Sequence, residues 1–192
     1  MTKILSEIQS ALCSLKKPCE SVLLALDGRC AAGKTTLAGQ LEQELGFGVI
    51  HMDDFFLRPE QRTSRRLAEV GGNVDWERFR AEVLLPLKQG VHFSYRPYDC
   101  HTQTLGEVIE VKPRLYSVVE GSYSCHPKLW DFYDLHIFLT IGVQEQLRRI
   151  QSRNGEAGLD IFQKKWIPLE EQYFKVFSIQ KRCELCFDTE QR

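Results

Sequence analysis

Residues 28–35 have the residue types and spacing of a loop that binds phosphate groups. They match the pattern G-x-x-x-x-G-K-[ST] without interruption and read Gly28-Arg29-Cys30-Ala31-Ala32-Gly33-Lys34-Thr35. Glycines at both ends let the backbone direct its N–H groups toward a polyphosphate, the lysine adds positive charge near the β- and γ-phosphates, and the threonine hydroxyl can bind Mg²⁺. We therefore expect Gly28 to Thr36 to bind a nucleoside triphosphate, with Lys34 in a catalytic role and Thr35 as a Mg²⁺ ligand.

Three carboxylates follow apolar segments at positions suited to phosphoryl transfer. Asp53 and Asp54 come after residues 47–52, and Glu120 comes after residues 115–119. Transfer to an alcohol needs a carboxylate within reach of the acceptor oxygen, and only one of the two aspartates should face the phosphates because adjacent residues of an extended chain point to opposite sides. Glu120 is predicted to hold Mg²⁺ directly or through water, as on a Walker B strand. The structural alternatives are a turn cap for the aspartates and an ordinary loop side chain for Glu120.

An arginine-rich helix precedes a glycine-bearing segment late in the chain. Arg149 and Arg153 share a helix face because they are four residues apart, and residues 154–158, Asn-Gly-Glu-Ala-Gly, have the composition of a loop. We predict a lid loop at residues 153–160 that closes over the nucleotide, with Arg149 and Arg153 as catalytic cations. The alternative is a solvated basic face, which we favour for a second group of arginines, Arg58, Arg62, Arg65 and Arg66.

The elements that must position these residues alternate between strand and helix. Apolar runs of strand length occupy residues 22–26, 47–52, 115–119, 135–139 and 184–187. Helical spacing of apolar residues or helix-start signals mark residues 8–15, 36–45, 59–69, 75–84, 143–153 and 160–181. This order predicts an α/β chain with the P-loop NTPase three-layer fold, in which a mostly parallel five-stranded sheet is covered on both faces. Residues 91–111 instead alternate polar and apolar side chains, which predicts an inserted two-stranded β-ribbon.

The length and charge of the chain limit the classes of protein to which it can belong. A chain of 192 residues is expected to form a single domain, 1–192. Lys and Arg number 25 against 26 Asp and Glu, so no global positive field would attract nucleic acid or an anionic membrane. The longest apolar runs are strand-sized, which argues against a signal peptide or membrane span and for a cytoplasmic protein with a small-molecule partner. No pattern in the sequence indicates an oligomer.

The seven cysteines are interpreted as small apolar residues of a protein in a reducing compartment. Cys183 and Cys186 have no second Cys or His pair at zinc-ligand spacing. Cys30 lies inside the phosphate loop, so we expect this position to make nucleotide binding sensitive to thiol reagents.

Taken together, these motifs resemble those of the uridine kinase family, in the group that also holds phosphoribulokinase, pantothenate kinase and nicotinamide riboside kinase. The resemblance covers residues 20–188 and rests on the phosphate loop, Asp53-Asp54-Phe55-Phe56, Tyr98-Asp99, Glu120-Gly121 and the arginine-rich helix. It is greatest to small bacterial uridine kinase-like proteins that carry the runs at 51–59 and 71–76. The resemblance implies ATP and Mg²⁺ as cofactors and a nucleoside-like small molecule as acceptor.

The resemblance also implies roles for individual residues. Asp53 takes the place of the family base that accepts the proton of the nucleoside 5′-hydroxyl, and Asp54 replaces a serine of the family motif. Tyr98 and Asp99 match the segment beside the nucleobase. His101 stands earlier than the family histidine that reads the pyrimidine. A further substrate-binding carboxylate, for the ribose hydroxyls, maps onto Asp75, where a helix N-cap is an equally good interpretation.

We therefore expect an ATP-dependent kinase that phosphorylates a primary alcohol, with uridine or cytidine as the leading acceptor. Nicotinamide riboside, pantothenate or another metabolite would use the same groups. A different class of function is a regulatory ATP-binding protein that hydrolyses ATP slowly and phosphorylates no metabolite. The inserted ribbon and Asp53 favour an enclosed acceptor site, and hence the kinase.

Overall fold

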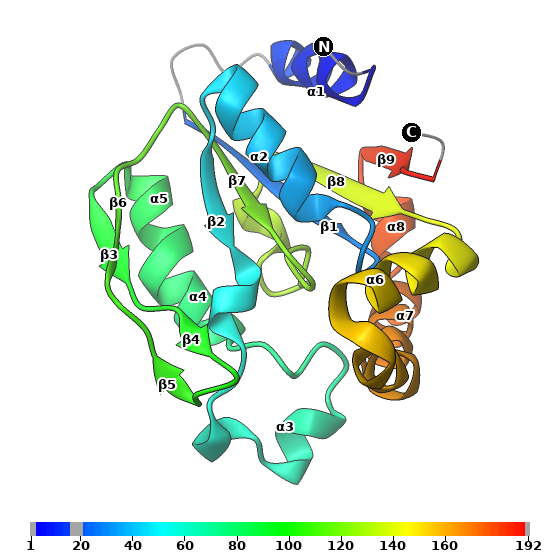
Figure 1. Ribbon diagram of the computed structural model, residues 1–192. Helices are drawn as coiled ribbons and strands as arrows, with labels where there is room; N and C mark the ends of the chain where they lie inside the picture. The colour runs from blue at the N-terminus through cyan, green and yellow to red at the C-terminus, as the bar shows by residue number, and fades with distance from the viewer. Residues whose placement is uncertain (1–2, 16–20, 191–192) are drawn as a thin grey trace.

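A sheet of five parallel strands in the order β2-β7-β1-β8-β9 forms the centre of the computed structural model (Figure 1). The structure describes residues 3–15 and 21–190. The strands are β1 Val22–Gly28, β2 Gly48–His51, β7 Tyr116–Glu120, β8 Leu135–Thr140 and β9 Leu185–Asp188. Each neighbouring pair in this order is parallel. The predicted α/β fold with a mostly parallel five-stranded sheet is confirmed.

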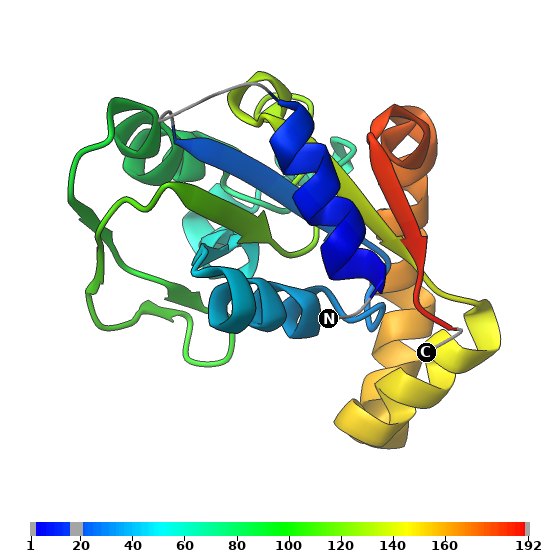
Figure 2. The same cartoon turned by 90° about the horizontal axis from the view of Figure 1, so that it is seen from above.

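Helices cover both faces of the sheet because its central strand is apolar on both sides. All residues of β1 are buried, and successive residues point to opposite faces. Leu24 packs in one core with α1 Lys3–Ser14 and α2 Lys34–Leu45, whereas Ala25 packs in the other with α7 Ile167–Val176. The layers can be followed in Figures 1 and 2.

Short helical segments follow β2. They are η1 Met52–Phe55, η2 Pro59–Gln61, α3 Ser64–Ala68, α4 Trp76–Phe79, the π-helical turn η3 Arg80–Leu84 and α5 Leu85–Gln89. The helix predicted at 59–69 is therefore two short pieces. The chain starts a new helix at α3 because the Thr63 hydroxyl accepts a hydrogen bond from the Arg66 backbone N–H at 3.1 Å, which is an N-cap.

The inserted segment 91–111 contains two short antiparallel strand pairs. β3 Phe93–Tyr95 pairs with β6 Ile109–Val111, and β4 Tyr98–Asp99 pairs with β5 Thr104–Leu105. Pro97 lies between β3 and β4, and a proline has no N–H to donate to a ladder. The segment is consequently two small sheets rather than one uninterrupted ribbon.

The segment predicted as a lid loop, 153–160, is mostly helical. α6 Val143–Ile161 runs through it, and its helical backbone is interrupted at Gly155, which has φ 69° and ψ −178°. Glycine tolerates this conformation because it has no Cβ. The prediction of a loop is wrong, because the glycine-bearing segment is a helix with a break.

The helix predicted at 160–181 is divided into three. The π-helical turn η5 Phe162–Trp166 leads into α7, and α8 Ile179–Arg182 is separate because Ser178 adopts a left-handed backbone with φ 52°. A last short helical turn, η4 Trp130–Phe132, precedes β8. In residues 3–15 and 21–190, no helix has the length and apolar composition that crossing a membrane requires.

Candidate functional site

The phosphate loop joins β1 to α2 at the carboxyl end of the central strand. Gly28 has φ 137°, and a Cβ at this position would lie 2.1 Å from the carbonyl oxygen of Leu139 in β8, so no other residue fits there. Gly33 caps α2 in a left-handed conformation without any side-chain cap. The backbone N–H groups of the first turn of α2 thus have no side-chain cap, and this end of a helix favours an anion.

Lys34 extends back over the loop. Its ammonium group donates hydrogen bonds to the carbonyl oxygens of Gly28 at 2.7 Å and Arg29 at 3.1 Å. The lysine is buried, with 8% exposure. The loop therefore encloses a positive charge at the position where the sequence motif requires it.

The predicted pair of Mg²⁺ ligands lies together at the carboxyl ends of β1 and β7. The Thr35 hydroxyl is 3.3 Å from both carboxylate oxygens of the buried Glu120. Oxygen donors of this kind are the ligands that Mg²⁺ takes, together with phosphate oxygens and water. The described residues include no cluster of three or more His, Cys, Asp or Glu arranged around a metal. The pair consequently fits an ion that is shared with a bound nucleotide, and does not form a complete protein cage.

His51 adds a partner to Glu120 that the sequence did not indicate. It ends β2, in register with Glu120 on β7, and its Nδ1 atom is 2.6 Å from a Glu120 carboxylate oxygen. This hydrogen bond raises the pKa of His51 above its ordinary value. A histidine thus orients the carboxylate that faces Thr35.

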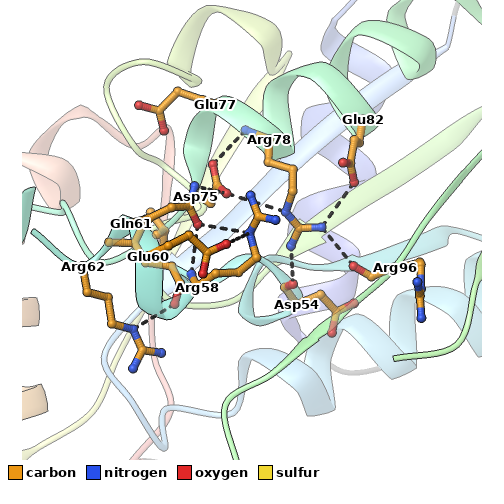
Figure 3. A network of polar contacts seen from close by, with 12 residues as sticks. Asp54, Arg58, Glu60, Gln61, Arg62, Asp75, Glu77, Arg78, Glu82 and Arg96 are labelled. Atoms are coloured by element: carbon orange, nitrogen blue, oxygen red, sulfur yellow. Dashed lines mark hydrogen bonds and ion pairs between the residues drawn. The ribbon is translucent and has the colours of Figure 1, made fainter. Parts of the chain in front are cut away.

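The two adjacent aspartates have different partners, although they lie in the 3-10 helix η1 and not on the extended chain that the sequence predicted. Asp53 is near Lys34, whereas the carboxylate of Asp54 accepts a hydrogen bond from the Tyr95 hydroxyl of the inserted segment at 3.0 Å. Figure 3 shows Asp54 beside the Arg78 guanidinium, which donates to its backbone carbonyl at 2.9 Å. Asp53 is therefore the member of the pair whose charge interacts with Lys34 of the phosphate loop.

The Asp53 side chain is accessible to solvent, although protein atoms surround it on several sides. The loss of hydration raises its pKa to about 6, against the lowering effect of Lys34, and Glu120 raises it further. Behind it, Gly121 has φ 137°, and a Cβ there would lie 2.9 Å from an Asp53 carboxylate oxygen. The close approach of Asp53 to the end of β7 explains why a glycine follows Glu120.

The two arginines predicted as catalytic have different surroundings. Arg149 donates to the carbonyl oxygen of Ala31 in the phosphate loop at 3.3 Å and to that of Thr189 at 3.2 Å. Arg153 is exposed, and it donates to the side chain of its neighbour Asn154 at 2.9 Å. The structure brings Arg149 to the loop and does not bring Arg153 there.

The residues predicted on the acceptor side are mostly engaged within the protein. Asp75 is buried and is the N-cap of α4: one carboxylate oxygen accepts from the Arg78 backbone N–H at 3.0 Å, and the other accepts from Gln61 at 2.7 Å (Figure 3). Asp99 accepts from the His101 backbone N–H at 2.7 Å and so closes the turn between β4 and β5.

Tyr98 and His101 complete the predicted acceptor-side set. Tyr98 is buried at the base of β4, and its hydroxyl is 3.5 Å from Arg62. His101 is exposed. The structure thus gives Asp75 and Asp99 clear structural roles, and their substrate contacts stay predictions.

Cys30 is buried, and its surroundings disfavour the thiolate. Burial raises the pKa of its thiol to about 12, and the nearby Glu170 raises it as well. Because the thiolate is the reactive form, the expected sensitivity to thiol reagents at this position does not follow from the structure.

Two further carboxylates support the loop, and few features of the sequence point to either. Asp27 is completely buried beside Gly28 and accepts hydrogen bonds from the backbone N–H groups of Gly28 and Cys125 and from the Tyr173 hydroxyl. Its position at the end of an apolar strand was the available signal. Glu170 in α7 accepts from the Cys30 backbone N–H at 3.0 Å. No periodicity marks Glu170, because it reaches the loop from a helix about 140 residues away in the sequence.

Comparison with known proteins identifies the fold. No family model matches the chain, and no curated protein does. Among solved structures, a possible uridine kinase from Bacillus stearothermophilus is 21% identical with a TM-score of 0.70, over 97% of this chain and 100% of that one. A D-glycerate 3-kinase from Cryptococcus neoformans is 14% identical with a TM-score of 0.62, over 89% of this chain and 88% of that one. The chain is similar to these proteins in fold, which is that of P-loop kinases.

Proposed function

We propose that this chain, with its P-loop kinase fold, is an ATP-dependent kinase that transfers a phosphoryl group to a primary alcohol of a small molecule. The observation that supports this most strongly is the position of Asp53. The charges of Lys34 and Glu120 both act on its carboxyl group, and the backbone N–H of Ser122, two residues after Glu120, donates to it. A donor cradle, a metal-binding pair and a carboxylate near them are the parts that phosphoryl transfer to an alcohol needs.

The proposed reaction assigns each group one task. Lys34 and the loop N–H groups bind the phosphates, and Arg149 stabilises negative charge on the transferred group. When bound, Mg²⁺ neutralises phosphate charge, held by Thr35 and Glu120. Asp53 accepts the proton of the acceptor alcohol. The oxygen of that alcohol bonds to the γ-phosphorus, the bond from this phosphorus to the β-phosphate oxygen breaks, and ADP is released.

The raised pKa of Asp53 suits this task. With a value of about 6, the carboxyl group is a stronger base than an ordinary aspartate and is still mostly ionised at neutral pH. A catalytic base works best when its pKa lies near the working pH.

The leading acceptor class is a nucleoside. The resemblance of Asp53-Asp54-Phe55-Phe56 to the uridine kinase motif supports it, as does the similarity in fold to a possible uridine kinase. The resemblance also places the aromatic residue Tyr98, at the start of β4, beside the nucleobase.

Arg62 favours a second candidate, a hydroxy acid. Its guanidinium lies 5.9 Å from the centre of the Tyr98 ring and donates to the Leu57 carbonyl at 2.9 Å, and none of the described carboxylates forms an ion pair with it. Partial burial raises the pKa of the Cys100 thiol. Arg62 lowers this pKa and Asp53 raises it, so both charges lie near the thiol. An acceptor with a carboxylate could bind Arg62 while its alcohol reaches Asp53, and the D-glycerate 3-kinase shares this fold.

One assay separates these candidates. ATP consumption is measured with protein alone and with pools of nucleosides, vitamins and hydroxy acids, and the phosphorylated product is identified by mass spectrometry. Stimulation by the nucleoside pool supports the first acceptor class, and stimulation by the acid pool supports the second. Equal slow hydrolysis with every pool would refute the kinase and support a regulatory ATP-binding protein.

The Asp53→Asn variant tests the assignment of the base. We expect it to fold and bind ATP but to lose turnover by a factor on the order of 10² to 10⁴. Asp54→Asn is the matched comparison, because its carboxylate contacts Tyr95 instead, and it should retain far more activity. If Asp53→Asn stays active while Asp54→Asn does not, the base is Asp54.

A further inference from the structure

Glu170 is a buried carboxylate that touches two loops of the site. It belongs to α7 and is 5% exposed. One carboxylate oxygen accepts a hydrogen bond from the Cys30 backbone N–H in the phosphate loop at 3.0 Å. The other accepts a hydrogen bond from the Ser122 hydroxyl, in the loop after β7, at 2.6 Å. One side chain therefore ties the donor cradle to the loop behind Asp53.

Ser122 extends this connection to the candidate base. Its hydroxyl donates to Glu170, and its backbone N–H faces the Asp53 carboxylate and lowers the pKa of that group. The contacts run from Cys30 through Glu170 and Ser122 to Asp53. The phosphate loop and the base, which come from different strands, are thus joined through α7.

The charge of Glu170 is unusual for its position. None of the described Lys or Arg side chains forms an ion pair with it, so its buried oxygens depend on hydrogen bonds with Ser122 and with the Cys30 backbone and thiol. A buried carboxylate without a cationic partner is costly, and its retention needs a reason beyond packing. Its charge also reaches the site, because it raises the pKa of Asp53 together with Glu120 and against Lys34.

We propose that Glu170 is a positioning residue for phosphoryl transfer, which holds the phosphate loop and the Asp53 side chain in fixed relation through Ser122. The proposal rests on the proposed kinase function and adds a group that touches neither nucleotide nor acceptor. It predicts that Glu170 and Ser122 act as a unit. Losing either one lets Asp53 shift relative to the γ-phosphate, and a displacement of about 1 Å in such a site is enough to cost 10²-fold in rate.

The kinetic test uses Glu170→Gln, Ser122→Ala and the double variant, with Gln172→Ala as the control. Gln172 is exposed on the same helix. We expect each single variant to lower kcat by roughly 10- to 100-fold with KM for ATP changed less than about threefold, and the double variant to lose no more than the worse single one. Additive losses, or an effect on KM alone, would overturn the proposal.

A second measurement does not depend on turnover. The Asp53 carboxyl carbon is titrated by NMR in the native protein, in Glu170→Gln and in Gln172→Ala, with Asp53→Asn to assign the signal. Glutamine keeps the shape of the side chain and removes its charge, so the pKa of Asp53 should fall in Glu170→Gln and stay unchanged in the control. An unchanged Asp53 titration in Glu170→Gln would show that Glu170 does not act on the base. Absence of any phosphotransfer by the native protein would instead refute the kinase function, and this titration would still decide whether Glu170 and Asp53 are coupled.

Discussion

Asp27 gives a prediction about stability that can be worked from the structure. Its carboxyl group is completely buried in β1, and burial raises its pKa from 3.8 to about 6, a larger effect than the opposing influence of Lys34 and the three hydrogen bonds. Between these two values the folded protein holds a proton that the unfolded chain has released. Stability therefore falls as the pH rises through this window.

The size of the effect follows from the two pKa values. Each pH unit well inside the window costs about 1.4 kcal/mol, and the slope is shallower near each of the two pKa values. Raising the pH from about 4 to 7 should therefore remove about 2.4 kcal/mol of unfolding free energy through Asp27. Asp27→Asn has no such titration. The free energy of unfolding of the native protein should thus fall by about 2.4 kcal/mol relative to that of the variant over this range.

The measurement is urea unfolding at several pH values between about 4 and 7 for the native protein, Asp27→Asn and the control Asp131→Asn, whose carboxylate is exposed. Taking the difference between native protein and variant cancels the titration of the other groups. A difference that stays constant within about 0.5 kcal/mol would refute the reasoning. A difference that changes in the opposite direction would mean that the attraction of Lys34 outweighs burial.

Other predictions concern the site. If Asp53 is the base, kcat/KM for the acceptor should fall about tenfold for each pH unit below roughly 6, because only the ionised carboxylate accepts a proton, and a pH–rate profile checks this. Gly121→Ala places a Cβ 2.9 Å from Asp53 and forces an unfavourable φ, so it should lose at least about tenfold in kcat and about 1–3 kcal/mol of stability in urea unfolding. Glu120→Gln should raise the Mg²⁺ concentration for half-maximal activity by roughly 10-fold or more, and an unchanged Mg²⁺ titration would remove Glu120 from the metal site. Arg149→Ala should reduce kcat/KM for ATP more than Arg153→Ala, because only Arg149 contacts the phosphate loop; equal losses in steady-state assays would contradict the structure.

The sequence predicted best the parts of the molecule that are continuous along the chain. The phosphate loop, its strand and its helix are local, so the glycine spacing and the apolar runs identified them together. The meeting of Thr35 and Glu120 was also predictable, because the carboxyl ends of parallel strands lie at one edge of a sheet. The choice of Asp53 over Asp54 came from the resemblance to the uridine kinase motif, because spacing alone indicated only that one of the two should face the phosphates.

The rest depends on contacts between distant segments, which leave no periodic signal. Glu170 reaches the loop from α7, and His51 meets Glu120 only because β2 and β7 are neighbours. The prediction of a loop at 153–160 failed for a local reason, since Gly155 interrupts a helix that the residues on either side are able to continue. Asp75 was ambiguous in the sequence because capping a helix and binding a hydroxyl both require a carboxylate.

The contact between Gly28 and Leu139 also determines when the site can first exist during synthesis. The loop is completed by a hydrogen bond from the Arg29 N–H to the Leu139 carbonyl at 3.1 Å, and β1 lies between β7 and β8. A growing chain contains the whole phosphate-loop motif early, but the strands that fix it are made more than 80 residues later. Such long-range pairing is slow because a large loop must close first. Nucleotide binding should therefore appear only after β8 has been synthesised, so that ATP stabilises later intermediates and gives no help to the earliest ones.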